Sequence, residues 1–390
     1  MSHIDDMIAA LAPNGVERRT LGDIAELVRG NGMPKTDLTE NGVGAIHYGQ
    51  IYTHYGVWTD STTSYVSPET AARLSTAGPG DIIITNTSEN IEDVCKAVAW
   101  LGDATIVTGG HATVIKHSLE PKYLAYWFQS QDFASQKRVL ATGTKVIDVS
   151  ARQLAKVRVP VPPLEIQREI ARILDQFTRL EAELEAELEA RRRQYAHYRS
   201  ELLSFSGEVP MRALGDLARN LDNRRKPVTK DARTAGDVPY YGASGVVDYV
   251  SDFIFDGDYL LVSEDGANLL ARSTPIAFSI SGKTWVNNHA HVLEFGTYAE
   301  RRFVEIYLNS IDLSPYVSGA AQPKLNKANL NRISVPDPAL ADKERVVALL
   351  DKFEALVNDL SIGLPAELAA RRKQYGHYRD RLLTFQEAAV

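Results

Sequence analysis

The residues best suited to chemistry lie in the second half of the chain and combine basic side chains, aromatic rings and amides. The segment Asn223–Lys230 reads NRRKPVTK and is a compact basic loop. Pro239–Gly245 follows it and holds two tyrosines and a serine among glycines that permit close approach to the backbone. Lysine and arginine suit phosphate groups, while arginine, asparagine, glutamine and serine can hydrogen-bond to base edges. These residue types together favour a nucleic-acid-binding face.

Two further segments of the same half extend this pattern. Gly282–His291 is rich in polar donors beside a predicted strand, and Gln322–Lys327 is a polar, basic loop. Solvated loops and a core tryptophan would explain any one of these segments, but their co-occurrence favours nucleic-acid binding. The predicted DNA-binding residues of this half are Arg224, Arg225, Lys226, Lys230, Tyr241, Ser244, Lys283, Asn287, Asn288, His289, Gln322 and Lys324.

Within this set we expect two roles. Arg225, Lys226 and Lys230 would anchor phosphates. Ser244, Asn287 and His289 would lie near bases.

The first half offers weaker equivalents in polar loops beside predicted strands, each of which also fits an ordinary surface loop. The predicted DNA-binding residues there are Gln50, Tyr52, Asn86, Ser88, His111, Thr144 and Lys145.

Catalytic motifs are missing from the sequence. Ser281–Thr284 resembles the end of a phosphate-binding loop, but Ala277 stands where the motif needs glycine. No amino-methyltransferase motif and no Gly-x-Ser-x-Gly elbow is present. His289 and His291 lack a third ligand nearby, so we predict no metal site. The chain is expected to bind rather than to catalyse.

The composition limits the possible classes of protein. The formal net charge is −7, from 43 lysines and arginines against 50 aspartates and glutamates, which argues against a general basic coat. DNA binding would therefore need basic side chains gathered on one face and partners that neutralise phosphates. One cysteine, Cys95, excludes an internal disulfide. No apolar run can span a bilayer and the start lacks a signal peptide, so we expect a soluble, cytoplasmic protein that contacts no membrane.

The elements that must position these residues are two long helices. Leu164–Phe205 carries apolar residues in steps of three and four along one stripe, which predicts a single helix of about 60 Å. Such a helix needs a partner, and Leu340–Phe385 supplies a second one. The ends of the two segments, ARRRQYAHYRSELLSF and ARRKQYGHYRDRLLTF, differ at only a few positions.

The order of motifs before the helices also recurs, so the chain is a tandem repeat of a globular α/β domain and a long helix. The predicted class is α+β, with the two helices paired as an antiparallel coiled coil. We divide the chain into a first globular domain at 1–160 with a leading helix at 3–12, a helical segment at 161–206, a second globular domain at 207–336, and a distal helical segment at 337–390. A coiled coil that only dimerises the chain is the alternative reading of the helices.

Details of the helices predict their ends and interruptions. The tetrad Glu-Ala-Glu-Leu repeats at 181–184 and 185–188. Asp337-Pro338 is expected to cap and begin the second helix. Gly363 and Pro365 are expected to break it, with a restart at Pro365.

Together these residues resemble the specificity (S) subunit of type I restriction–modification systems over essentially the whole chain. The most specific parts are Pro162-Pro163-Leu164-Glu165-Ile166-Gln167 and the repeated Arg-Arg-Arg/Lys-Gln-Tyr-x-His-Tyr-Arg. The second helix departs from the family pattern, because Asp337–Asp342 lacks the glutamine.

The resemblance implies two target recognition domains, each reading one half of a bipartite, gapped DNA site, and helices that fix the gap. It implies no catalytic role and no cofactor bound by this chain. Two modification subunits would carry S-adenosylmethionine and methylate adenine, and up to two restriction subunits would use ATP and Mg. The residues expected to pair the helices or to contact modification subunits are Phe177, Leu184, Leu188, Tyr195, Tyr198, Phe353, Tyr375 and Tyr378.

Two functional hypotheses follow. The first is a sequence-specific DNA-binding subunit that positions methyltransferase partners on double-stranded DNA. The alternative is a structural adaptor whose two heads bind proteins at the ends of a coiled-coil rod. Salt-sensitive binding to duplex DNA distinguishes them.

Overall fold

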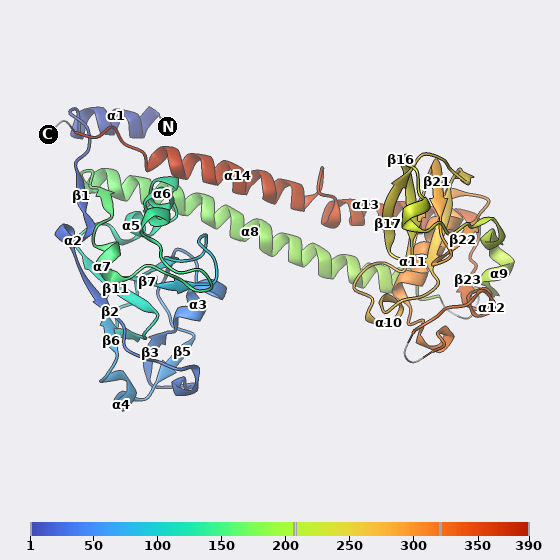
Figure 1. The fold of residues 1–390 in the computed structure, drawn as a ribbon, viewed down its shortest axis with the longest axis horizontal. Helices are drawn as coiled ribbons and strands as arrows, with labels where there is room; N and C mark the ends of the chain where they lie inside the picture. Colours follow the sequence, from blue (N-terminus) through green and yellow to red (C-terminus); the bar gives the residue numbers. More distant parts are fainter. Residues whose placement is uncertain (1, 206, 208, 320–321, 389–390) are drawn as a thin grey trace. The chain divides into compact units, whose positions relative to one another are not determined.

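The computed structural model describes residues 2–205, 207, 209–319 and 322–388 of the chain. The chain divides into two compact units (Figure 1). Unit 1 contains residues 1–185 and 368–390, and unit 2 contains residues 186–367. The boundaries between the units fall inside two helices, α8 (Leu164–Leu202) and α14 (Leu364–Leu382).

Unit 1 is a mixed α/β domain that begins with a short helix, α1 (Ser2–Leu11). Before α8, its further helices are α2 (Leu21–Ile24), α3 (Tyr48–Thr53), α4 (Pro68–Ala71), α5 (Pro121–Trp127), α6 (Gln131–Leu140) and α7 (Ala151–Leu154), with a 3-10 turn at Lys35–Asp37. Its strands are β1 (Arg18–Thr20), β2 (Ala25–Arg29), β3 (Val43–Ile46), β4 (Trp58–Thr59), β5 (Ser64–Val66), β6 (Ser75–Ala77), β7 (Ile82–Thr85), β8 (Thr87–Ser88), β9 (Ala97–Trp100), β10 (Ile106–Thr108), β11 (Ala112–His117), β12 (Ile147–Asp148) and β13 (Arg158–Pro160).

Two sheets form the centre of unit 1. One has the order β2-β11-β7-β9-β4 and the other β5-β3-β10-β6. The buried strand β7 shows why they pack together, because successive side chains of a strand point to opposite faces. Ile82 and Ile84 join the core that contains α5 and the start of α8, whereas Ile83 packs on the other side with Val98 and Ile106.

Unit 2 repeats this organisation with fewer elements. Its further helices are α9 (Leu214–Leu217), α10 (Asn268–Ala271), α11 (Tyr298–Ser310), α12 (Lys327–Asn331) and α13 (Leu340–Asn358), with 3-10 turns at Asp222–Arg224, Lys230–Ala232 and Ser314–Tyr316. Its strands are β14 (Met211–Ala213), β15 (Arg219–Asn220), β16 (Ala235–Gly242), β17 (Gly245–Val250), β18 (Phe255–Asp256), β19 (Tyr259–Ser263), β20 (Ala277–Ile280), β21 (Lys283–Val286), β22 (Ala290–Glu294) and β23 (Ser334–Pro336).

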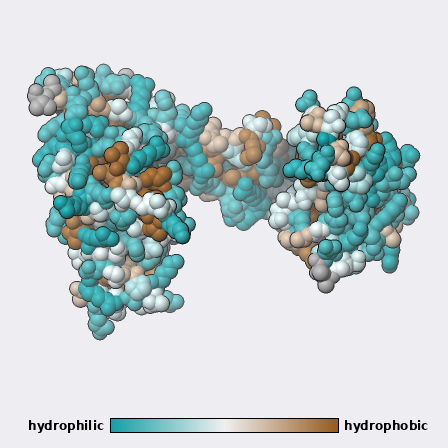
Figure 2. Space-filling view, in the orientation of Figure 1, coloured by the Kyte–Doolittle hydropathy of each residue, from teal (hydrophilic) through white to brown (hydrophobic). Residues whose placement is uncertain are grey.

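The sheets of unit 2 have the orders β15-β22-β19-β20 and β17-β16-β21-β18. Strand β19 alternates like β7, since Leu260 and Val262 join one buried cluster and Leu261 joins the other. In Figure 2 the visible face of unit 2 is mostly hydrophilic or neutral, whereas that of unit 1 shows several hydrophobic areas.

The long helices pair in an antiparallel manner within unit 1, where α8 and α14 lie side by side (Figure 1). Phe177 stacks on Tyr378 with ring centroids 5.5 Å apart, and Arg372 forms ion pairs with Glu181 and Glu185. Positions rise along α8 as they fall along α14, which defines the antiparallel direction. The predicted α+β class, tandem repeat and antiparallel helix pairing are confirmed.

Unit 2 contains the second half of α8, packed against α13. The ring centroids of Tyr198 and Phe353 are 5.5 Å apart, and Leu203 shares a buried cluster with Val346 and Val347. The apolar stripe of α8 is thus covered by another helix of the same chain.

The other predicted stripe residues differ in exposure. Tyr375 also packs near Phe177, with ring centroids 6.3 Å apart. Tyr195 is half-buried beside the core of unit 2. Leu188 is buried and Leu184 is half-buried.

The interruption of the distal helical segment is confirmed, but its predicted start is wrong. Helix α13 ends at Asn358 and α14 begins at Leu364. A side chain at Gly363 would place its Cβ 2.4 Å from the carbonyl oxygen of Ala355, so only glycine fits there. Asp337 does not cap α13, which begins at Leu340, because the Asp337 carboxylate forms ion pairs with Lys343 and Arg212 instead.

Candidate nucleic-acid interface

Strand register shows which positions of the two units are equivalent. In unit 1, β7 pairs with β11 so that Thr85 faces Ala112. In unit 2, β19 pairs with β22 so that Ser263 faces Ala290. This register makes four pairs of positions equivalent: Asn86 and Glu264, Thr87 and Asp265, His111 and His289, and Thr113 and His291.

In unit 2 the turn between β21 and β22 presents a histidine, His289, at the surface. The Nδ1 atom of His289 lies 2.9 Å from each carboxylate oxygen of Asp265. The backbone amide of His289 donates to Oδ1 of Asn287 at 2.8 Å. Asn287 itself is buried, so its predicted place near bases is wrong, and its amide instead shapes the turn that presents His289.

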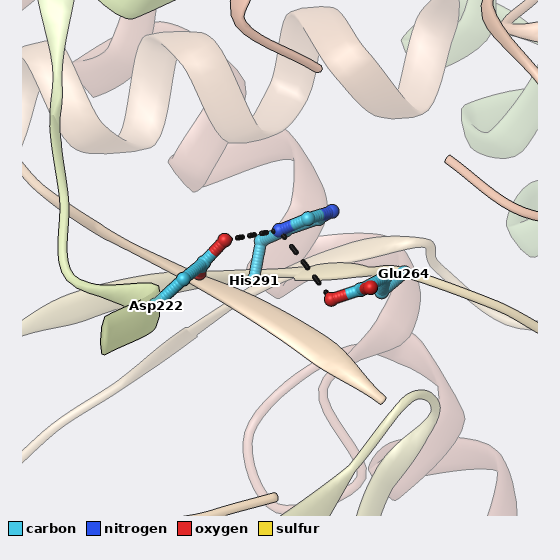
Figure 3. Close-up of side chains that lie close together, drawn as sticks. All are labelled: Asp222, Glu264 and His291. Carbon is cyan, nitrogen blue, oxygen red and sulfur yellow. Dashed lines mark hydrogen bonds and ion pairs between the residues drawn. The ribbon is translucent and has the colours of Figure 1, made fainter. Parts of the chain in front are cut away.

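His291, two residues after His289, belongs to a cluster of charged side chains with Asp222 and Glu264 (Figure 3). His291 is fully buried, and its Nδ1 lies 2.6 Å from Oδ2 of Asp222 and 3.7 Å from Oε2 of Glu264. Its Nε2 lies 2.7 Å from the carbonyl oxygen of Leu325. Since both ring nitrogens face oxygen acceptors, both can donate only when the ring is an imidazolium.

Two further cations complete the cluster. Arg225 Nη1 lies 2.5 Å from Oε2 of Glu264 and donates to the carbonyl of Ala290 at 2.8 Å, while Lys324 Nζ lies 3.2 Å from Oε1 of Glu264. Only 13% of the Arg225 side chain is exposed, because both carboxylates engage it. The prediction that Arg225 anchors phosphates is therefore wrong, because its guanidinium forms ion pairs with Asp222 and Glu264 inside the protein.

The cations control the protonation of the two carboxylates. Burial acts to raise the pKa of Asp222, but the hydrogen bond from His291 and its charge outweigh burial and hold the pKa below its usual range. Burial also acts to raise the pKa of Glu264, and the hydrogen bond from Arg225 with the charge of His291 again lowers it. Among the described residues, Asp222, Glu264 and His291 are the only group spaced to hold a metal ion. Their charges are already balanced by cations, so the group fits a structural ion-pair cluster better than a metal site.

The remaining basic residues of the predicted face stay accessible. Lys226, Lys230 and Lys283 are exposed. Trp285 donates through Nε1 to the carbonyl of Lys226 at 2.6 Å, and both residues line a cavity of about 570 Å³. Arg224 is exposed and donates to the carbonyl of Ile254 at 2.8 Å. These side chains can reach phosphates without breaking buried contacts.

The other predicted residues of unit 2 lie at or near the surface. Ser244 is exposed in the β16–β17 turn, and Asn288 is exposed beside His289. Gln322 is exposed in the loop that ends at Lys324. Tyr241 is half-buried and packs against Phe278 with ring centroids 6.1 Å apart, so it supports the face.

Unit 1 has a cavity of about 700 Å³ at the place equivalent to the His289 turn. Its lining includes the loop at 30–35, His47, Tyr48 and His111. Tyr48 packs on His111 with ring centroids 4.8 Å apart, and Thr87 Oγ1 shares a 3.0 Å hydrogen bond with Nδ1 of His111. Burial, followed by the charges of Lys35 and His111, lowers the pKa of His47. His111 thus lines a cavity large enough for a ligand, and its DNA-binding role stays a prediction.

Three predicted residues of unit 1 belong to the scaffold. Asn86 is fully buried, donates to the carbonyl of Val149 at 2.7 Å and accepts from Thr113 at 2.9 Å, so its predicted DNA contact is wrong. Gln50 caps α3 through the amide of His47. The Tyr52 hydroxyl donates to the carbonyl of Thr87 at 2.7 Å, and burial raises its pKa to about 12.

The other predicted residues of unit 1 are spread over neighbouring loops. Ser88 pairs with Ile147 in the small β8–β12 sheet. Thr144 and Lys145 are exposed in the loop that precedes β12. The structure does not gather these three around the cavity that contains His111.

Several residues at these places were not among the predicted site residues, although Tyr48 and Thr87 stand in polar loops that the sequence pointed to. Lys35 and Tyr48 line the unit 1 cavity, and Thr87 and Asp265 hold the two histidines. The glycine-rich run at Gly30–Gly32 was a usable signal, because a Cβ at Gly30 would lie 2.0 Å from the carbonyl oxygen of Gly109. The partners of the histidines carried no such signal, since they are distant in sequence.

Comparison with known proteins identifies the family. The model named Type I restriction modification DNA specificity domain matches residues 13–190 and again 207–370. The chain belongs to this family. The two matches correspond to the tandem repeat.

Curated relatives of this specificity-domain chain carry matching names. A Haemophilus influenzae protein, provisionally named a type I restriction enzyme specificity subunit, is 36% identical over 191 residues. That match spans 48% of this chain and 49% of the relative, about half of its length. A type I restriction enzyme specificity subunit of Escherichia coli is 29% identical over 295 residues, covering 68% of this chain and 70% of the relative.

Solved structures share the fold. The S subunit of a type I restriction-modification system from M. genitalium covers 94% of this chain and 96% of its own, with a TM-score of 0.56 at 15% identity. A chain from a study of assembly and conformational transition of the type I R-M system covers 95% of this chain and 98% of its own, with a TM-score of 0.64 at 14% identity.

Among the described residues, no helix is both long and apolar enough to cross a membrane.

Proposed function

We propose that this chain is the DNA specificity subunit of a type I restriction–modification complex. Each unit would read one half of a bipartite, gapped site in double-stranded DNA. The observation that carries the proposal is the second match of the specificity-domain model, because two such domains in one chain suit two half-sites. The equivalent placement of His111 and His289 in the two units supports it.

The chain would act without catalysing a reaction. Two modification subunits would bind S-adenosylmethionine and methylate adenine, and up to two restriction subunits would use ATP and Mg. The charge balance supports this division of labour, because a chain with a net charge of −7 needs partners to neutralise DNA phosphates. The chain would act in the cytoplasm, where the DNA that it would bind is accessible.

The long helices would set the gap between the half-sites and dock the modification subunits. The contacts of Phe177 with Tyr378 and of Tyr198 with Phe353 support helix pairing inside the chain rather than dimerisation of two chains. Removing residues 185–188, which lie inside the continuous helix α8, should shorten the recognised gap and leave both half-site sequences unchanged.

Methylation mapping tests the proposal most directly. Adenine methylation would be mapped in cells with and without the gene, in a strain whose modification subunits are active. Loss of methylation at one gapped motif is the expected result. An unchanged pattern would contradict the proposal, and so would a reconstituted complex whose binding to duplex DNA is insensitive to salt.

A further inference from the structure

The Asp265–His289 pair holds an imidazole in place through one ring nitrogen. Nδ1 of His289 meets both oxygens of Asp265 at 2.9 Å, and 51% of the His289 side chain remains exposed. The neighbouring cations Arg225 and Lys324 pair with Glu264 instead of Asp265. Among the described residues, no hydrogen bond engages Nε2 of His289, which is the nitrogen left to meet a ligand.

A carboxylate at Nδ1 decides what Nε2 can offer. A neutral imidazole carries a single ring proton, and an ionised carboxylate accepts hydrogen bonds but donates none. The proton of the neutral ring therefore resides on Nδ1, and Nε2 presents a lone pair. In the major groove of DNA, the base groups that donate to such an acceptor are the amino groups of adenine and cytosine.

The equivalent position of unit 1 lacks this constraint. His111 Nδ1 shares its hydrogen bond with the hydroxyl of Thr87, and a hydroxyl either donates or accepts. Either nitrogen of His111 can then carry the proton. His111 also lines the cavity of about 700 Å³, so this position of the repeated fold faces a space that a ligand can enter.

We propose that Asp265 is a specificity-determining positioning residue. It fixes the proton on Nδ1 of His289, so that Nε2 accepts a hydrogen bond from the amino group of an adenine or cytosine in the second half-site. Thr87 leaves His111 free to donate or accept, so the first half-site is read less strictly at the equivalent contact. This proposal rests on the proposed DNA-binding function and names the chemistry of one contact in it.

The test uses the full-length chain assembled with its modification subunits. Binding is measured on duplex libraries in which one half-site is held constant and the other is varied. We expect the wild type to prefer adenine or cytosine at one position of the second half-site. Asp265→Asn should reduce that discrimination about 10-fold, because the amide of asparagine can donate as well as accept. The preferences in the first half-site should not change.

Three further measurements make the result specific. Asp237→Asn removes an exposed carboxylate from β16 of the same unit and should leave the preference at that position unchanged. Thr87→Asp installs the carboxylate in unit 1 and should sharpen discrimination in the first half-site alone. For a preferred adenine, purine in its place should weaken wild-type binding about 10-fold, since purine lacks the amino group.

The outcomes separate this proposal from the function on which it rests. We expect Asp237→Asn to change the affinity for all sequences by one common factor at most. If Asp265→Asn does the same, the proposal is overturned while DNA recognition stands. If the wild-type complex binds no split site, the proposed function itself fails, and the role of Asp265 fails with it.

Discussion

The two units have different side chains and different polar contacts at equivalent buried positions of the repeated fold. In unit 1, Nδ2 of Asn86 donates to the carbonyl of Val149, and Thr113 donates to the same amide side chain. In unit 2, Leu325 is equivalent to Val149, because its amide donates to the carbonyl of Glu264 as that of Val149 donates to the carbonyl of Asn86. The Leu325 carbonyl accepts from Nε2 of His291. A neutral amide–hydroxyl pair in one unit is thus replaced by an ion-pair cluster in the other, so the units should respond differently to mutation and to pH.

The largest difference is expected when one member of each arrangement is removed. Asp222→Ala removes the carboxylate 2.6 Å from the buried His291 and leaves Glu264 as the one carboxylate shared by His291 and Arg225, so it should destabilise unit 2 by about 3–5 kcal/mol. Asn86→Ala removes neutral hydrogen bonds and should cost unit 1 only about 1–3 kcal/mol. Hydrogen exchange, measured separately in β7–β11 and in β19–β22, gives the loss of stability of each unit. Equal losses of protection would show that charge adds nothing at this position.

A transplant tests whether the two chemistries are interchangeable. Glu264→Asn with His291→Thr imports the unit 1 pair into unit 2. Because the two residues share one network, the double change should destabilise by about 1–3 kcal/mol less than the sum of the single changes. Urea denaturation of the four proteins of the cycle measures the coupling, and strict additivity would mean that the two side chains act independently.

The next largest difference is expected in the pH dependence of stability, which should be larger for the ion-pair cluster of unit 2 than for the Asn86–Thr113 pair of unit 1. The pKa values of Asp222 and Glu264 are lowered in the folded state by His291 and Arg225, against burial. Their stabilisation is therefore fully present above the unfolded values, which are near 4, and is lost as the pH falls through the lower folded values.

The measurement compares wild type with Asp222→Asn in urea at pH values from 7 to 3. The stability difference between them should shrink as Asp222 becomes protonated. Asn86→Ala in unit 1 is the matched control, because neither Asn86 nor Thr113 titrates. A difference for Asp222→Asn that stays constant to pH 3 would contradict the assigned charge state.

The smallest effect is expected from exposed lysines, which should behave alike in both units. Lys226→Ala and Lys145→Ala should each weaken binding of the complex to all sequences roughly 3-fold and reduce the salt dependence by about one ion. Binding measured at several salt concentrations checks this. A change of preferred sequence in Lys226→Ala would show that Lys226 reads a base instead of a phosphate.

The sequence predicted the features that rest on local or repeated patterns. The helical stripe of α8, the break at Gly363 and the tandem organisation follow from periodicity, backbone chemistry and repetition. It could not separate buried from exposed polar residues. Arg225 lies in a basic run that suits phosphates, yet its partner Glu264 is distant in sequence. Asn86 stands in a polar loop, and only the fold places Val149 and Thr113 against it.

Because α13 and α14 are separated by an interruption and α8 is continuous, the two helical segments differ in how they can change length during evolution. In α8, inserting a single residue turns every later side chain by about 100° and moves the apolar stripe off its partner, so only whole turns preserve packing. The segment between Asn358 and Leu364 is not helical, and residues added there need not rotate α14. Insertions and deletions during divergence should therefore accumulate at this break in single steps, while α8 changes by about one turn at a time.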